Sequence, residues 1–529
     1  MLGDRWNRSV IPRWRNSTIV ASTLEAGPSR FTPEVVPRPN LLPLLDERLS
    51  EWNAHPTIGG AADLLAYDQF PELRPHLQKI AKYVLSSDQP LPIPLKEAAQ
   101  RALEIPSLDS SDLVGPNSRR IEEIHTLRHR LALNPRNAVA YVDLARWYAA
   151  LGRNEQALRL LNISKALEPN SRFVIRAIAR FHIHANDPER ALAVVNHAVA
   201  LKEDPWLMAS SVAISNLLGK SGRIAKYART LVSSDTFHPS QVPELASALA
   251  TLEMFSGSQK KARKLFNIAL VQPNDNSVAQ ALWAADHLKT TIEVQDKWLD
   301  DPLSAEARYY RAFFGGNLEA ALMASKEWFA DEPFSSRPMT SASFICGLLE
   351  NYEAMERCCR VGLVADPLNV GLRNNLAFSL SSQWRLEEAV EILRDLLQEE
   401  KDALSGHTLA NLGQLMYREG FVEEGEMLYR KALDRLKVQG LSTSQALAMA
   451  YMAREALLAN AENSEKLVAE AKGLAKEFPS TGVDVVLRSV TASPTNLEVP
   501  SKKILRDQKW RYDKERNLLL IEESRPFKE

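Results

Sequence analysis

Cysteine and net charge are what this sequence has least of. The 529 residues include three cysteines, Cys346, Cys358 and Cys359, and the formal net charge is −1. An odd, sparse set of thiols excludes a disulfide framework and is typical of a reducing compartment. A net charge near zero excludes a global field toward DNA or an anionic membrane, so any such binding requires a local patch.

Long apolar runs are also missing. No run approaches the ~18 residues of a membrane span, and the first 30 residues lack the apolar core of a secretory signal. We therefore expect a cytoplasmic protein that does not engage a membrane. The Arg-rich, Ser-containing start leaves open a mitochondrial transit peptide within residues 1–25.

Signatures of catalysis are absent as well. There is no P-loop, no GxSxG and no GxGxxG after a strand. His125 and His129 have the i, i+4 spacing that metals use, but no HExxH motif or cysteine cluster accompanies them. We expect no enzyme activity, no cofactor and no metal.

Proline divides the chain into two regions. Of the 29 prolines, 14 lie in the first 120 residues. Residues 1–40 show no sustained period and predict an extended or disordered arm. Short amphipathic patterns broken by proline and glycine follow over residues 41–118, and we interpret them as an N-terminal helical capping region. From about residue 119 to 478 the pattern is one amphipathic helix after another.

Those helices repeat with a period of 34 residues. Ala145 shifts onto Ala179 and then Ala213, and Ala157 shifts onto Ala191 in the same way. The small residues of the two helices stay 12 apart, because small side chains are needed where two helices cross closely. Further pairs with this spacing are Ala250 and Ala262, Ala342 and Ala354, Ala377 and Ala389, and Gly413 and Gly425.

This pattern resembles the tetratricopeptide repeat (TPR) family. The first copy agrees with the family consensus at nearly every position, namely Tyr141, Leu144, Ala145, Tyr148, Gly152, Ala157, Leu161 and Pro169. The resemblance covers residues 119–478 and is weakest near 275–335. It implies an all-α fold, a right-handed superhelix of helix–turn–helix units whose first helices line the concave surface. Residues 479–529 are expected to be a linker with a short β-hairpin or tail.

A row of arginines marks the stretch RFVIRAIARFHIH. Arg172, Arg176 and Arg180 fall four apart, so they share one helix face. The repeat pattern directs this face into the concave groove, with Arg146 equivalent to Arg180 in the preceding copy. Two interpretations remain open: a surface that binds an acidic partner segment, or internal ion pairs, for which nearby acidic residues are candidates. The flanking groove residues are Phe173 and His184, and the candidate carboxylates for internal ion pairs are Glu155, Asp187 and Glu189.

Amide side chains form a second candidate surface. Asn375 and Asn411 hold equivalent groove positions in successive copies, with Asn374 and Gln414 beside them. Amides both donate to and accept from a peptide backbone, so these residues predict a ladder that captures an extended chain. The alternative is that an asparagine near a helix start only caps the helix.

Both chain ends carry tryptophan next to arginine. Trp6 and Trp14 lie in the arm, and Trp510 and Tyr512 begin a strand-like pattern that continues at residues 518–521. Such side chains are good anchors for a partner. Whether the groove is empty, filled by residues 1–40 or occupied by another chain stays open.

The resulting hypothesis is a non-enzymatic TPR scaffold, adaptor or regulatory subunit. It would bind a protein or peptide with an acidic segment and take part in a multi-subunit complex, with nucleic acid engaged only indirectly. A second hypothesis is an inhibitory or recruiting partner of a nucleic-acid-processing effector in a bacterial multi-gene system of the toxin–antitoxin or defence type. A third is direct RNA binding by the basic groove, which salt dependence would reveal.

Overall fold

The protein divides into two compact units, residues 27–122 and residues 1–26 with 123–529, and each is described by itself. The computed structural model describes residues 9–17, 42–66, 73–87, 91–104, 117–220, 223–234, 236–288, 292–400, 405–492, 510–513 and 518–521. Among these residues, no helix is both long enough and apolar enough to cross a bilayer.

The unit of residues 27–122 has a core of its own. Trp52 is buried against Leu64 and Leu77, and its ring meets that of Tyr83 edge-on at 5.6 Å. Thr57 accepts a hydrogen bond from the N–H of Gly60, which caps a helix start. The helices predicted in this region are present as α2 (Leu42–Ala54), α3 (Ile58–Leu65), α4 (Arg74–Leu85) and α5 (Ile93–Glu104).

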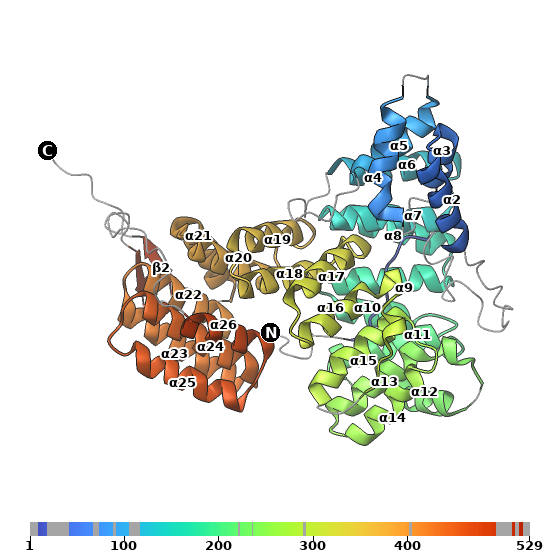
Figure 1. Cartoon of the computed structure of the whole chain (residues 1–529). Coiled ribbons are helices and arrows are strands. Elements are labelled where there is room, and N and C mark those ends of the chain that lie inside the picture. Colours follow the sequence, from blue (N-terminus) through green and yellow to red (C-terminus); the bar gives the residue numbers. More distant parts are fainter. Residues whose placement is uncertain are drawn as a thin grey trace. The chain divides into compact units, whose positions relative to one another are not determined.

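The other unit is a row of antiparallel helix pairs (Figure 1). After α6 (Asn117–Leu133), the pairs are α7 (Ala138–Ala150) with α8 (Asn154–Leu167), α9 (Arg172–His184) with α10 (Pro188–Asn196), α11 (Pro205–Leu217) with α12 (Arg223–Ser233), α13 (Pro243–Phe255) with α14 (Gln259–Ala269), α16 (Ala305–Phe314) with α17 (Leu318–Asp331), α18 (Arg337–Leu348) with α19 (Tyr352–Ala365), α20 (Val370–Ser382) with α21 (Leu386–Glu400), α22 (Gly406–Arg418) with α23 (Val422–Val438), and α24 (Ser442–Leu458) with α25 (Ser464–Glu477). The predicted all-α solenoid is therefore confirmed.

The weakly patterned stretch 275–335 also stays helical. It contains α15 (Asp275–Leu288), which packs on α16, and the short 3-10 helices η5 (Asp296–Trp298) and η6 (Pro302–Ser304). A third short 3-10 helix, η4 (Pro239–Gln241), precedes α13.

Local chemistry sets where these helices begin. Asn137, Asn317, Asn351 and Asn369 each accept a hydrogen bond from the backbone N–H three residues further on, just before a helix. Such caps satisfy backbone donors that have no partner inside the helix. The repeated caps keep the helix pairs in register.

The crossing of α22 and α23 uses the glycines that the repeat pattern singled out. A Cβ atom added at Gly413 would lie 2.6 Å from the Tyr429 ring and 3.0 Å from the carbonyl oxygen of Gly425. A Cβ at Gly425 would meet the Tyr417 ring at 2.6 Å. Only glycine lets α22 and α23 approach this closely.

The array returns to its starting point after α19. Gly152, in the turn between α7 and α8, has a φ of 71°. A Cβ at this position would be 2.4 Å from the carbonyl oxygen of Val364 in α19. The first superhelical turn, α7 to α19, therefore closes on itself through backbone contact.

Helical structure extends beyond the predicted end at residue 478. The last helix, α26 (Thr481–Ala492), packs against α24 and α18. Val486 and Val490 join a core with Ile345, Leu348 and Ala450. The expected linker from residue 479 is thus wrong in its first part, because an apolar helix face covers the apolar surface of two earlier repeats.

Two short strands follow near the C-terminus. β1 (Trp510–Asp513) pairs antiparallel with β2 (Leu518–Ile521), with Trp510 opposite Ile521. Only the backbone of these strands is among the described parts of the chain.

Candidate functional site

The concave interior of the first superhelical turn holds a segment of the chain itself. Residues 9–17, here called the strap, form no helix or strand before Ser17, and residues 9–15 are all buried. At one end Ser9 donates to the carbonyl oxygen of Ala213 in α11. At the other end the backbone N–H of Ser17 donates to Asp143 in α7. The strap therefore crosses the interior between distant repeats.

Arg13 of the strap lies among three carboxylates. Its guanidinium is 2.6 Å from Glu306, 3.1 Å from Asp275 and 3.2 Å from Glu332. The Arg13 side chain is 4% exposed, and those of Glu306 and Glu332 are 1% exposed. These groups are out of water, so each depends on the others for compensation.

Arg15 binds the next pair of carboxylates. Two of its nitrogens donate to the two oxygens of Asp275, at 3.0 and 2.7 Å, in the bidentate geometry that guanidinium favours. Its Nε donates to Asp331 at 2.9 Å. Asp275 therefore contacts both strap arginines and lies at the centre of the site.

Trp14 fills an aromatic pocket between the two arginines. Its ring centre lies 4.8 Å from that of Phe334 and 6.1 Å from that of Phe181, the latter edge-on. The residue is 1% exposed. Its indole Nε1 has no hydrogen-bond partner among the described residues, so the pocket recognises the ring surface.

Two side chains of the array bind the strap backbone. Asn276 donates to the carbonyl oxygen of Ile11 at 3.0 Å, and Arg146 donates to the carbonyl oxygen of Trp14 at 3.0 Å. Main-chain carbonyls are present in any sequence, so these bonds hold an extended chain without specifying its side chains.

The charged groups stabilise one another's ionised forms. Burial alone lowers the pKa of a guanidinium, but the carboxylates of Glu306, Glu332 and Asp275 hold the pKa of Arg13 above its ordinary value. Burial alone raises the pKa of a carboxyl, but Arg13 and Arg180 hold the pKa of Glu332 well below its usual range. Both partners are therefore charged at neutral pH.

The arginine row of α9 lies inside this network. Arg176 donates to Glu244 at 2.9 and 3.0 Å and to the carbonyl oxygen of Trp206 at 3.1 Å. Arg180 donates to Ser335 at 3.2 Å and lies 3.7 Å from Glu332. Burial lowers the pKa of Arg180 to about 10.

Of the two interpretations of these arginines, the structure supports internal ion pairs, and their availability to a partner is wrong for Arg176 and Arg180. Arg176 is 4% exposed and Arg180 is 2% exposed. Their carboxylate partners come from α13 and the end of α17, and none is Glu155, Asp187 or Glu189. Neutralised by buried acids, the two side chains offer neither an acidic peptide nor RNA a free cation.

The other predicted residues of this groove also make their contacts within the chain. Arg146 donates to the strap and to the carbonyl oxygen of Asp331, and Arg172 pairs with Asp204 at 3.1 Å. Phe173 packs on the core beneath the strap. The His184 ring lies 5.8 Å from that of Phe334, and burial lowers its pKa to about 3.

The amide ladder is used within the chain. Asn375 donates to Ser343, Asn411 donates to the backbone and side-chain oxygens of Asn374, and Gln414 donates to Ser382. Asn374 in turn donates to Val370 and Thr408. The predicted rungs exist, but their donors join successive first helices to one another instead of reaching for a peptide.

The terminal anchors divide into three cases. Trp14 anchors the strap inside its own chain, so that part of the arm is neither disordered nor free. Trp6 lies outside the described residues. Trp510 and Tyr512 belong to β1, where only the backbone is described.

The acidic half of the site was not found from the sequence. Asp275, Glu306 and Glu332 come from the stretch where the repeat pattern is weakest, so register could not place them on the concave face. The available signal was the Arg13–Trp14–Arg15 triplet, whose burial requires matching acids.

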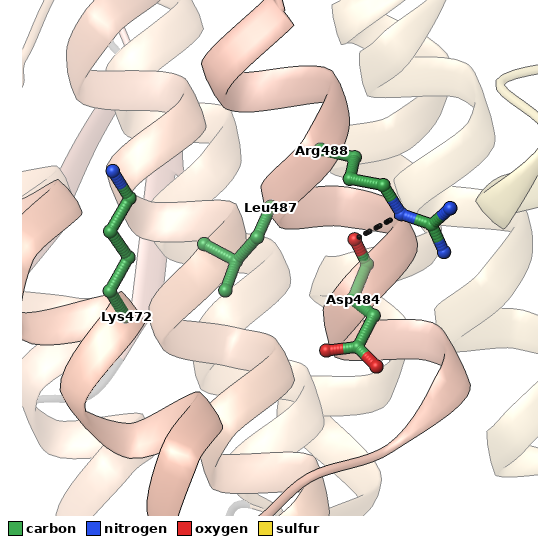
Figure 2. A pocket seen from close by; sticks show the side chains of 4 residues that line it. All are labelled: Lys472, Asp484, Leu487 and Arg488. Carbon is green, nitrogen blue, oxygen red and sulfur yellow. Dashed lines mark hydrogen bonds between the residues drawn. The ribbon is translucent and has the colours of Figure 1, made fainter.

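A second feature is a hollow of about 310 Å³ at the end of the array. Figure 2 shows Lys472 of α25 on one side of it, and Asp484, Leu487 and Arg488 of α26 on the other. Arg488 donates to the carbonyl oxygen of Asp484 at 3.2 Å. The charged side chains are exposed and opposite in sign, so the hollow has no built binding chemistry.

Comparison with known families gives one match. Residues 371–398, which span α20 and most of α21, match the family model described as tetratricopeptide repeat. This helix pair is a repeat of the TPR type, in agreement with the resemblance found in the sequence. No curated protein sequence matches the chain with significance.

Two solved structures resemble the chain. The crystal structure of yeast Tom70 has 14% identity and a TM-score of 0.32, covering 71% of this chain and 93% of that one. The human IFIT1 dimer with PPP-AAAA has 12% identity and a TM-score of 0.36, covering 74% of this chain and 97% of that one.

Proposed function

We propose that this protein is a non-enzymatic scaffold or adaptor that binds protein segments inside its TPR-type superhelix. It would act as one subunit of a larger complex and have no catalytic role. A cytoplasmic location is part of the proposal and rests on the three free, buried cysteines, which are typical of a reducing compartment.

The strap is the observation that supports this proposal. It is held as a bound peptide would be: two arginines in acidic pockets, a tryptophan in an aromatic pocket and two backbone carbonyls on side-chain donors. Recognition of an extended chain by alternating pockets and main-chain bonds is a common mode of peptide binding. The concave interior thus has the chemistry of a receptor for protein segments.

The charge of this interior selects the kind of segment. Because Arg176 and Arg180 are paired with buried acids, we do not assign an acidic peptide to the first superhelical turn. The carboxylates that remain after this pairing face cationic side chains, so a basic segment is the better fit.

The experiment is a capture from the native source with the tagged full-length chain. Wild type, Trp14→Ala and Arg159→Ala are compared, each with and without nuclease, and captured proteins are identified by mass spectrometry. Arg159 is a matched control because its side chain is 77% exposed on the outer helix α8.

We expect a protein partner that survives nuclease treatment and is equally retained by wild type and Arg159→Ala. Its recovery with Trp14→Ala should differ from that with wild type, because this change alters occupation of the interior. Capture that disappears with nuclease, or no specific protein with any of the three chains, would contradict the scaffold role.

A further inference from the structure

We infer that the strap is an exchangeable internal ligand, and that the interior recognises a partner segment with tryptophan between two arginines. This inference rests on the scaffold role proposed above and names the chemistry of the partner. The argument comes from the charge balance of the site, its aromatic pocket, its backbone donors and the position of the strap within the chain.

The charge balance requires two added cations. Among the described residues, five carboxylates contact the strap, and three arginines contact the strap or one of these carboxylates, a difference of 5 − 3 = 2 negative charges. The carboxylates are Asp143, Asp275, Glu306, Asp331 and Glu332, and the arginines are Arg146, Arg180 and Arg337. Arg13 and Arg15 supply the two missing charges.

The positions of these charges define a spacing. Asp275 contacts both strap arginines, Glu306 and Glu332 receive Arg13, and Asp331 receives Arg15. Removing the strap leaves an excess of buried negative charge, which is strongly unfavourable, so an emptied site favours a ligand with two guanidinium groups separated by one residue. The planar fork of arginine fits Asp275 in a bidentate way that lysine does not reproduce.

The residue between the two arginines must be a large aromatic. The pocket formed by Phe334 and Phe181 encloses the Trp14 ring. Arg180 lies over the Phe334 ring at 4.9 Å from its centre, which fixes the far wall of the pocket. A small side chain here would leave a void between two rings, and voids in a packed interior are destabilising.

The strap is an internal segment, not a chain end. Residues 1–8 precede it, and the chain continues after Ser17. Recognition uses the carbonyls of Ile11 and Trp14 and no terminal amine or carboxylate. A partner can therefore offer an Arg–Trp–Arg triplet from any accessible stretch of its own chain.

Competition with the strap makes this site regulated. A tethered segment competes at an effective concentration in the millimolar range, so a partner present at micromolar levels enters only when the strap is weakened or the partner binds more tightly. In the intact chain the strap thus occupies the interior and blocks a partner segment from binding there.

The test is a titration of purified full-length chain with a fluorescein-labelled peptide of residues 9–17, SVIPRWRNS, read by anisotropy after prolonged equilibration. Three chains are compared: wild type, Trp14→Ala and the double variant Trp14→Ala/Asp275→Asn. Two further peptides carry alanine in place of the tryptophan or in place of both arginines.

We expect Trp14→Ala to bind the native peptide about 10-fold or more tightly than wild type does, because the competing strap is weakened. Compared with the native peptide binding to Trp14→Ala, affinity should fall about 10-fold or more when the double variant replaces Trp14→Ala. The same loss is expected when either alanine peptide replaces the native peptide. The native peptide should also raise the melting temperature of Trp14→Ala, since a ligand that binds only the folded chain stabilises it.

Absence of peptide binding to a Trp14→Ala chain of wild-type helicity would overturn the inference, and so would equal binding of the alanine peptides. If Trp14→Ala does not fold, Arg15→Ala serves as the weakened chain under the same criteria. The titration uses purified components, so its failure is separate from a failed capture, which concerns the scaffold role itself.

Discussion

Replacing Trp14 with alanine tests whether the strap is bound as described. The side chain is 1% exposed and contacts two aromatic rings, and truncation of such a buried tryptophan costs about 3–5 kcal/mol. Because the strap forms no helix or strand before Ser17, we expect the loss to favour strap opening over global unfolding.

Limited trypsin digestion reads this opening directly. Trypsin cleaves after Arg13 and Arg15 only when the strap is out of its site, since both side chains are 4% exposed when it is bound. When opening and closing are fast relative to cleavage, the rate follows the open population. A loss of about 3 kcal/mol then accelerates cleavage about 160-fold, at 1.36 kcal/mol for each factor of ten.

Cleavage after Arg159 provides the internal standard. Arg159 lies on the exposed face of α8, so its cleavage depends on opening of that helix and not of the strap, and its rate should be the same in both chains. If Arg13 and Arg15 of wild type are cut as fast as those of Trp14→Ala, the strap does not protect them, and the description of the site is refuted.

Three further predictions concern the array. Gly152→Ala should destabilise the fold by about 2 kcal/mol more than Gly257→Ala, measured by urea denaturation; both glycines have positive φ, but only the Cβ at 152 meets a backbone oxygen. Equal costs would disprove the superhelical closure. Burial raises the pKa of Glu419 in the folded chain to about 7. The fold is therefore most stable below the unfolded pKa of this carboxyl, where it is protonated in both states, and loses stability as the pH rises through the folded pKa. Glu419→Gln should stabilise the fold by about 2 kcal/mol more at pH 8 than at pH 5. A pH-independent difference would contradict the buried carboxylate. Arg176→Ala should cost about 3–5 kcal/mol and Arg159→Ala less than about 0.5 kcal/mol, and similar melting curves for the two variants would show that the first ion pair is not buried.

The repeat architecture was predictable because its signal is local. Small residues 12 apart, such as Ala377 and Ala389, mark where one helix crosses the next, and the same pair recurs at intervals of about 34 to 36 residues. The same rule explains Gly413 and Gly425, where glycine replaces alanine because a Cβ atom would meet the facing helix. The packing of each helix pair is therefore determined by residues that are close together in the sequence.

The candidate site was predictable only in part because its contacts are distant. The period placed Arg176 and Arg180 on the concave face, which is where they lie. It did not give their partners, since Glu244 is 68 residues from Arg176, and Glu332 belongs to the weakly patterned stretch. Whether an arginine on that face meets water or an acid depends on superhelical closure and on the strap, and neither has a local signature.

Sequence distance gives the strap a further consequence during synthesis. Arg13 and Glu332 are 319 residues apart, so joining them closes a loop that costs about 5 kcal/mol of chain entropy by (3/2)RT ln n. The strap is synthesised before its partners on the array, and its binding site is incomplete until α18 has been made. A truncated or misfolded array cannot bind the strap, which then stays exposed to proteases. The strap can therefore bind only after the whole first superhelical turn has been synthesised and folded.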